Sequence, residues 1–260
     1  MTDLFSLLPA YSAPVFLFIA AVLVLAGFVK GVIGLGLPTI SVGLLGLIMA
    51  PVQAAALLLV ANLVTNAWQL LAGPDLRGIL RRLWPMLAGV VLGTFLGAAW
   101  FPLGAFSWAT ALLGLALLAY AGLGLAQRQL PLQPGQEIWA GPLVGLATGL
   151  VTILTGVFVI PAVPYLQALR LEKDDLVQAL GLSFLVSTIA LGLALLATGA
   201  GGYGDGMAAA ALLALLPALG GMLLGQALRS RISAASFRRW FFGGLLALGG
   251  YLLAKSLLHA

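Results

Sequence analysis

One lysine interrupts the first long apolar stretch of this sequence. Lys30 lies in residues 27–38, GFVKGVIGLGLP, which also contain four glycines and a proline. Glycine lets the backbone leave helical geometry, and proline can occupy the first position of a new helix. The free N–H groups and the positive dipole end of such a helix attract anions. The segment therefore predicts a broken helix that binds an anion, with the hydroxyls of Thr39 and Ser41 as further donors.

Lys30 itself has two interpretations. A lysine at membrane depth is costly and indicates a functional site, here an anion-attracting residue at the mouth of the site. A helix that starts near Ala13 would instead place Lys30 close to the cytoplasmic end of the helix, where the side chain could reach the interface and anchor the topology. The matching position in the second half of the chain is Thr148, so the repeat described below does not require this charge.

The glycines of the same segment are also open to two interpretations. Small residues let two helices approach closely in a membrane, and for Gly27 and Gly31 this packing role is favoured. For Gly34 and Gly36, which lie next to Pro38, a helix break is favoured. The second half carries a counterpart over residues 152–156, followed by two prolines.

A neutral polar face follows on the helix predicted for residues 51–72. Its members recur at spacings of three and four residues, so they share one side of the helix. Because unpaired amides are costly in lipid, this face either binds another helix or lines a transport path. The equivalent helix has hydroxyl groups, and two such faces favour a path. The first set is Asn62, Thr65, Asn66 and Gln69, and the second is Ser183, Ser187 and Thr188.

The scarcity of acidic residues and histidine also limits the possible functions. All seven acidic residues lie in loops, tails or span edges, and the single histidine is His259. Neither a catalytic constellation nor a P-loop is visible, so we expect no enzyme, metal site or cofactor. A positive interior with neutral donors suits a small anion, and the coupling ion could be a proton or sodium.

The composition places these residues in a membrane. Of 260 residues, 62% are hydrophobic and 7% charged, against about 25% charged in soluble domains. The net charge of +5 is then expected from basic cytoplasmic loops and not from nucleic-acid binding. We predict an all-α polytopic membrane protein, because the spans are continuously apolar. They cover about 13–50, 51–72, 83–103, 105–126, 138–168, 175–199, 206–228 and 236–258.

The basic residues predict how these segments are oriented. The first and fifth segments are too long for one span, and each contains glycine and proline, so each is read as a broken, re-entrant hairpin. If the first and fifth segments each return to the side of the membrane on which they begin, ten of the twelve Lys and Arg residues become cytoplasmic. The positive-inside rule favours this arrangement. Both termini then lie outside, and only Lys30 and Lys255 remain unexplained.

An internal repeat accompanies this topology. The spaced glycines 27 and 31 recur as 145 and 149, Val-Gln-Ala at 52–54 recurs at 177–179, and Pro85-x3-Gly-x3-Gly recurs from Pro217. Corresponding loops fall on opposite faces, so the repeat is inverted, as in many secondary transporters. We therefore predict two four-segment halves, 1–126 and 138–260, joined by a cytoplasmic linker at 127–137.

Four segments together resemble the sulfite exporter TauE/SafE family: GFVKGVIGLGLP, APVQAAALLLVANLVTNAWQL, GLATGLVTILTGVFVIPAVPYL and LVQALGLSFLVST. The resemblance covers nearly the whole chain. It implies a multi-pass transporter of the bacterial inner membrane for sulfite, sulfonates, sulfoacetate or other organic anions. The commoner Gly-Gly pair is replaced here by Gly36-Leu37 and by Thr155-Gly156. The resemblance places the substrate between two sets of flanking residues, Gly31, Gly34, Gly36 and Pro38, and Gly149, Thr155, Gly156 and Pro161.

The leading functional hypothesis is export of a small sulfur-containing anion by alternating access, with both termini periplasmic. One alternative is an uptake permease for an organic sulfonate or carboxylate, and another is a non-transporting membrane scaffold. The expected partners are a small anion and the lipid bilayer, with a homodimer possible and no nucleic acid. The candidate substrate-binding residues are Lys30, Gly34, Gly36, Thr39, Ser41, Asn62, Asn66, Gln69, Thr152, Thr155, Gly156, Ser183 and Ser187.

Overall fold

A computed structural model describes residues 13–101, 108–126, 132, 135–200 and 205–258. All regular structure in these residues is helical, as expected. Seven helices in this part of the chain are long and apolar enough to cross a membrane. They are α1 (Ala13–Ile33), α5 (Leu76–Trp100), α6 (Ala109–Ala126), α7 (Glu137–Thr155), α9 (Lys173–Thr198), α10 (Asp205–Leu228) and α11 (Ala234–Leu258).

Both over-long segments are broken where the glycines and prolines predicted. After α1, Gly34 and Gly36 adopt positive φ values of 80° and 112°, a region that glycine enters without steric cost. The short helix α2 (Leu37–Leu45) then begins, with Pro38 in its first turn. After α7, Gly156 has a φ of 73°, and the short helix α8 (Ala162–Ala168) follows. Each segment is therefore a long helix followed by a shorter arm.

The prediction of one helix over residues 51–72 is wrong. The structure has α3 (Pro51–Leu57) and α4 (Leu59–Leu71), which are bent by 56° relative to each other. Neither glycine nor proline lies at the bend, so no local signal marks it. The N–H of Leu58 there is shared between the carbonyls of Ala54 and Ala55, at 3.2 Å each. The backbone of Gly156 packs against the Ala55 side chain, so a contact from the other half of the chain accompanies the bend.

Helix α5 begins at Leu76, earlier than the span predicted from residue 83. Asp75 caps the helix, because its carboxylate accepts a hydrogen bond of 2.9 Å from the Gly78 N–H. Asp and Asn side chains are favoured caps because they satisfy free N–H groups of the first turn. The basic residues of this region therefore lie on the first two turns of α5.

Glycines bring helices of the two halves into backbone contact. On α1, a Cβ added to Gly27 would lie 2.1 Å from the Ala218 carbonyl oxygen of α10, and Gly31 lies against Gly225. On α7, a Cβ at Gly145 would lie 2.0 Å from the Met86 carbonyl oxygen of α5. The packing role expected for Gly27 and Gly31 is confirmed. In both pairs the contacts advance together along the two helices, so α1 runs parallel to α10, and α5 parallel to α7.

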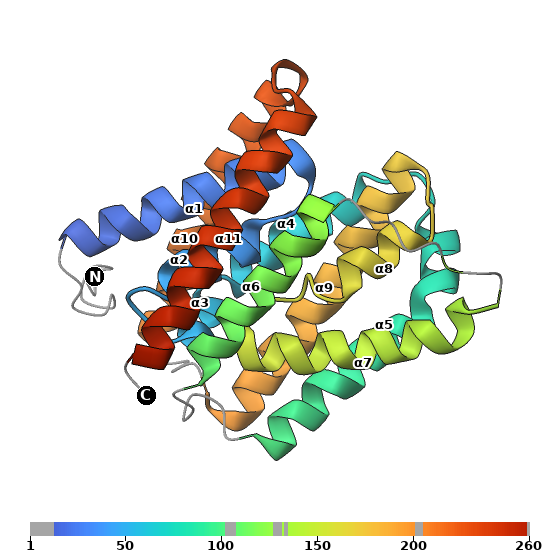
Figure 1. Cartoon of the computed structure of the whole chain (residues 1–260), viewed down its shortest axis with the longest axis horizontal. Coiled ribbons are helices and arrows are strands. Elements are labelled where there is room, and N and C mark those ends of the chain that lie inside the picture. Colours follow the sequence, from blue (N-terminus) through green and yellow to red (C-terminus); the bar gives the residue numbers. More distant parts are fainter. Residues whose placement is uncertain (1–12, 102–107, 127–131, 133–134, 201–204, 259–260) are drawn as a thin grey trace.

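Two further pairs run antiparallel. On α6 and α11, Gly114 lies against Gly249, whereas Gly124 lies against Phe242. On α4 and α9, Gly73 after α4 contacts Gln178, whereas Gly192 contacts Leu59. Figure 1 shows α6 beside α11 and α5 beside α7. Helices α4 and α9 occupy corresponding places in the two halves of the chain, as do α6 and α11, and each of these two pairs packs antiparallel.

Candidate functional site

Lys30 points into the helix bundle. Its side chain lies near the end of α1 and is only 3% exposed. The Nζ atom donates hydrogen bonds to Oγ1 of Thr65, at 3.0 Å, and to Oδ1 of Asn66. Both partners are neutral and belong to α4. The lysine is therefore held inside the protein and does not reach out to the membrane interface.

The two polar faces predicted from the sequence meet beside Lys30. Asn66 of α4 donates through Nδ2 to Oγ1 of Thr188 on α9, at 3.4 Å. Thr65, the other partner of Lys30, donates to the Ala61 carbonyl within its own helix at 2.7 Å. A continuous set of hydrogen bonds thus joins α1, α4 and α9 at this level.

Two glutamines link α4 and α9 by hydrogen bonds next to the break between α1 and α2. Gln69 donates through Nε2 to the carbonyls of Gly34, at 2.9 Å, and Val177, at 3.0 Å. In return, Gln178 of α9 donates to the Leu70 carbonyl at 2.9 Å and accepts a bond of 2.9 Å from the Asp75 N–H. The broken backbone at Gly34 is therefore fixed to both equivalent helices.

A pocket of about 420 Å³ lies at this junction. Three of the candidate residues line it: Lys30, Gly34 and Gln69. At the other end of the pocket are exposed side chains, including Asp174 and Arg229, the first residue of the short 3-10 helix η2 (Arg229–Arg231). The pocket thus extends from exposed residues near Arg229 to the buried ammonium group of Lys30.

Several candidate residues carry buried polar atoms that have no hydrogen-bond partner among the described residues. Buried polar groups are normally bonded, and of the five residues concerned only Gln69 lines the pocket beside Lys30. The three hydroxyls could donate to an anion, whereas the two amide oxygens accept only. The hydroxyls belong to Thr39, Ser41 and Ser183, and the amide oxygens to Asn62 and Gln69.

Five further candidate residues lie away from this pocket. The hydroxyls of Thr152, Thr155 and Ser187 each bond a carbonyl one turn earlier in their own helix, at 2.7, 2.7 and 2.9 Å. Gly156 packs against α3, and Gly36 against Val29 and Phe241. Among the described residues, none of these five lines the pocket beside Lys30.

Sequence reasoning missed Asp174, Gln226 and Arg229 as pocket residues. One signal for Gln226 was present in the repeat. The spaced glycines of α1 pack on those of α10, where Gly31 meets Gly225. Pairing these two glycine motifs would have placed the neighbouring Gln226 beside the end of α1.

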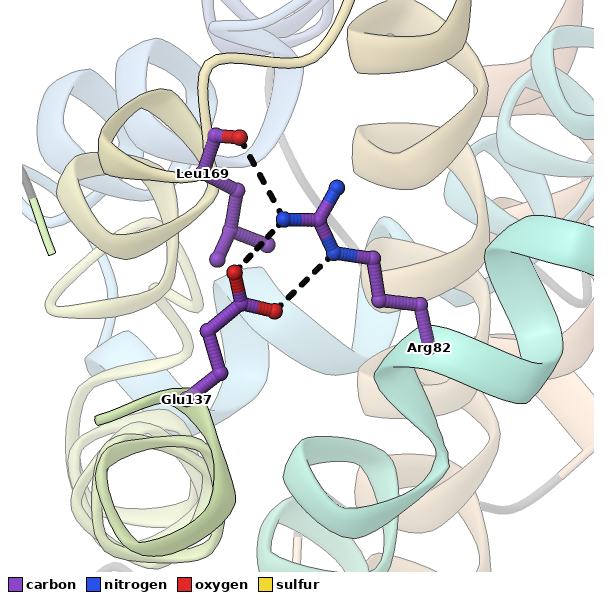
Figure 2. Close-up of polar contacts among 3 residues, drawn as sticks. All are labelled: Arg82, Glu137 and Leu169. Atoms are coloured by element: carbon purple, nitrogen blue, oxygen red, sulfur yellow. Dashed lines mark hydrogen bonds and ion pairs between the residues drawn. The ribbon is translucent and has the colours of Figure 1, made fainter. Parts of the chain in front are cut away.

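Basic side chains hold both short arms at their ends. Figure 2 shows Arg82 of α5 reaching Glu137, the first residue of α7, and the carbonyl of Leu169 after α8. Its Nε and Nη2 atoms lie 2.9 and 2.6 Å from the two carboxylate oxygens, and Nη2 lies 3.4 Å from the carbonyl. Lys255 of α11 similarly donates to the Leu47 carbonyl after α2 at 3.2 Å, which accounts for the other unexplained lysine.

The Arg82–Glu137 pair is expected to contribute little to the free energy of unfolding. Its side chains are 39% and 36% exposed, and exposed ion pairs are worth up to about 1 kcal/mol. A double-mutant cycle of Arg82→Gln and Glu137→Gln should therefore give a coupling energy of roughly 0.5 kcal/mol, which shrinks in high salt. A coupling above about 2 kcal/mol would contradict this expectation and show that solvent screens the pair much less than its exposed fractions indicate.

Comparison with known proteins supplies the family. The model of the sulfite exporter TauE/SafE family matches residues 19–252, which is most of the chain. Searches of the curated proteins and of the solved structures gave no match. The match includes both broken segments and the pocket at Lys30. The chain therefore belongs to the sulfite exporter TauE/SafE family of membrane transporters.

Proposed function

We propose that this protein is a secondary transporter that moves sulfite or an organosulfonate such as sulfoacetate, by export, across the bacterial inner membrane. The observation that carries the proposal is the environment of Lys30. The side chain is buried, its two hydrogen-bond partners are neutral, and it lines a pocket open to solvent. An anion entering this pocket would supply the opposite charge that a buried ammonium group requires.

The hydrogen-bonding capacity of the site fits such an anion. A lysine ammonium has three donors, and two are used by Thr65 and Asn66. The third has no partner among the residues that the structure describes, so it could donate to one oxygen of a sulfite or sulfonate group. Charge-assisted hydrogen bonds of this kind are the stronger ones in proteins.

We further infer that the two halves form an inverted repeat that works by alternating access. The parallel pairs α1–α10 and α5–α7, and the antiparallel pairs α4–α9 and α6–α11, support this arrangement. Transporters built in this way bind substrate near the membrane midplane, where helices are broken. Arg229, which the proposed topology places on the cytoplasmic side, lines the pocket, and we therefore assign this conformation to an inward-facing state.

The topology can be tested with single cysteines, because the chain contains none. Cysteines at Arg81 and Arg231 should both react from the cytoplasmic side, since both positions belong to the basic clusters. A cysteine at Leu257, which is 70% exposed at the far end of α11, should react from the periplasmic side. Labelling of positions 81 and 231 from opposite sides would contradict the inverted arrangement.

Flux into liposomes tests the transport function itself. The purified full chain should move labelled sulfite or sulfoacetate faster than protein-free liposomes do, and an organic carboxylate should move more slowly. Proton and sodium gradients applied in turn would identify the coupling ion. Faster movement of the carboxylate would support the alternative of a carboxylate permease. No flux of any of these anions under either gradient would contradict the proposal and favour a non-transporting scaffold.

A further inference from the structure

A second cavity lies apart from the pocket at Lys30. It has a volume of about 710 Å³ and is bounded by α6, α7, α8 and α11, and it shares no lining residue with the first. This volume falls in the range of sites for small organic ligands. The transport site does not account for this cavity, which we call the α6–α8 crevice.

The lining of the α6–α8 crevice combines an apolar body with positive charge. Tyr120, Leu123 and Phe242 contribute rings and aliphatic groups, whereas Arg170 and Arg238 contribute two guanidinium groups. Arg170 is exposed and Arg238 is half-buried. No carboxylate is among the lining residues. A complementary ligand therefore has an anionic head and an apolar body.

The crevice lies near the ends of three helices that are long and apolar enough to span a membrane. Leu123 and Gly124 are in the last turn of α6, which ends at Ala126, and Ala140 is in the first turn of α7. Arg238 lies in the second turn of α11. These helix ends lie at the face of the protein that carries the basic clusters, including Arg77, Arg81, Arg229 and Arg231. Basic residues at such a face attract anionic lipids.

We infer that the α6–α8 crevice binds an anionic phospholipid. Its phosphate lies between Arg170 and Arg238, and its glycerol and upper acyl chains contact the apolar lining of α6 and α11. Guanidinium groups suit phosphate because they present several donors in a planar fork. Basic pockets between membrane helices on the cytoplasmic side are a known setting for such headgroups. This inference is independent of which anion the protein transports.

Native mass spectrometry of the full chain in detergent tests the inference. Phosphatidylglycerol and phosphatidylcholine with identical acyl chains would be titrated separately. We expect phosphatidylglycerol to bind at least roughly tenfold more tightly, because two basic residues each contribute about fivefold. Equal binding of the two lipids to the wild-type protein would overturn the inference, and this comparison does not depend on any variant folding.

Arginine substitutions test whether phosphatidylglycerol binds in the α6–α8 crevice. Arg170→Gln and Arg238→Gln should each weaken phosphatidylglycerol binding about fivefold, and the double variant roughly 25-fold. Arg81→Gln and Arg231→Gln are the matched controls, because both arginines are exposed on the same face and line neither cavity. They should change the affinity less than twofold. Unchanged binding in the double variant would overturn the inference.

A competition experiment separates a lipid from a soluble anion. Glycerol phosphate carries the same phosphate chemistry without acyl chains, so it should displace bound phosphatidylglycerol only at far higher concentration. Displacement at equal concentration would mean that the crevice recognises a soluble phosphate, and the lipid assignment would be wrong.

Discussion

Replacing Lys30 with methionine is expected to lower anion transport roughly 10- to 100-fold, since a hydrogen bond to a charged group is worth about 1.5–3 kcal/mol. The buried ammonium group is the innermost charge of the pocket. Methionine has a similar length and no charge, so the bundle loses an expensive buried cation and should stay folded. The initial rate of sulfoacetate uptake into liposomes measures the effect.

Lys255→Met provides the control for this substitution. Lys255 bonds only to the Leu47 carbonyl among the described residues, at 3.2 Å, and lines neither cavity. The same change of side chain there should leave the transport rate within about twofold of wild type. A wild-type rate in Lys30→Met, with the topology unchanged, would show that this lysine takes no part in transport.

A large effect on stability is expected at Gly221. A Cβ added there would lie 2.1 Å from the Val24 carbonyl oxygen of α1, and backbone atoms cannot move aside as a flexible side chain can. Gly221→Ala should therefore push α10 away from α1 and lower the free energy of unfolding by roughly 1–3 kcal/mol or more. Thermal unfolding in detergent, followed by circular dichroism, measures the change.

The preceding residue offers a matched control within the same helix. A Cβ added to Gly220 would meet nothing within 4 Å. Alanine is favoured over glycine in a helix by up to about 1 kcal/mol, so Gly220→Ala should be neutral or stabilising. If both substitutions lowered stability equally, close backbone packing at Gly221 would not explain the result.

Patterns of residue type predicted the features that depend on local sequence. The breaks at Gly34 and Gly156 could be predicted because glycines with a following proline signal the end of a helix. The polar face on α4 could be predicted because three- and four-residue spacing defines one side of a helix. The glycine motifs predicted close packing, and the structure adds which helix each motif meets.

Features that depend on contacts between the halves could not be predicted in the same way. The bend at Leu58 has no glycine or proline and accompanies packing of the distant Gly156 against α3. The direction of the Lys30 side chain was left open, because the sequence places it at a helix end but not against a particular neighbour. Its contact with Thr65 and Asn66 depends on how α1 and α4 cross.

Substrate protection of a cysteine in the pocket tests most directly whether the anion binds beside Lys30. Ala72 lines the pocket and is exposed, and alanine differs little from cysteine in size. Sulfoacetate, which unlike sulfite does not react with maleimides, should slow maleimide labelling of Ala72→Cys but not of Arg81→Cys. Protection should disappear when Lys30→Met is added. Equal protection with and without Lys30, or none in either protein, would contradict the proposed site.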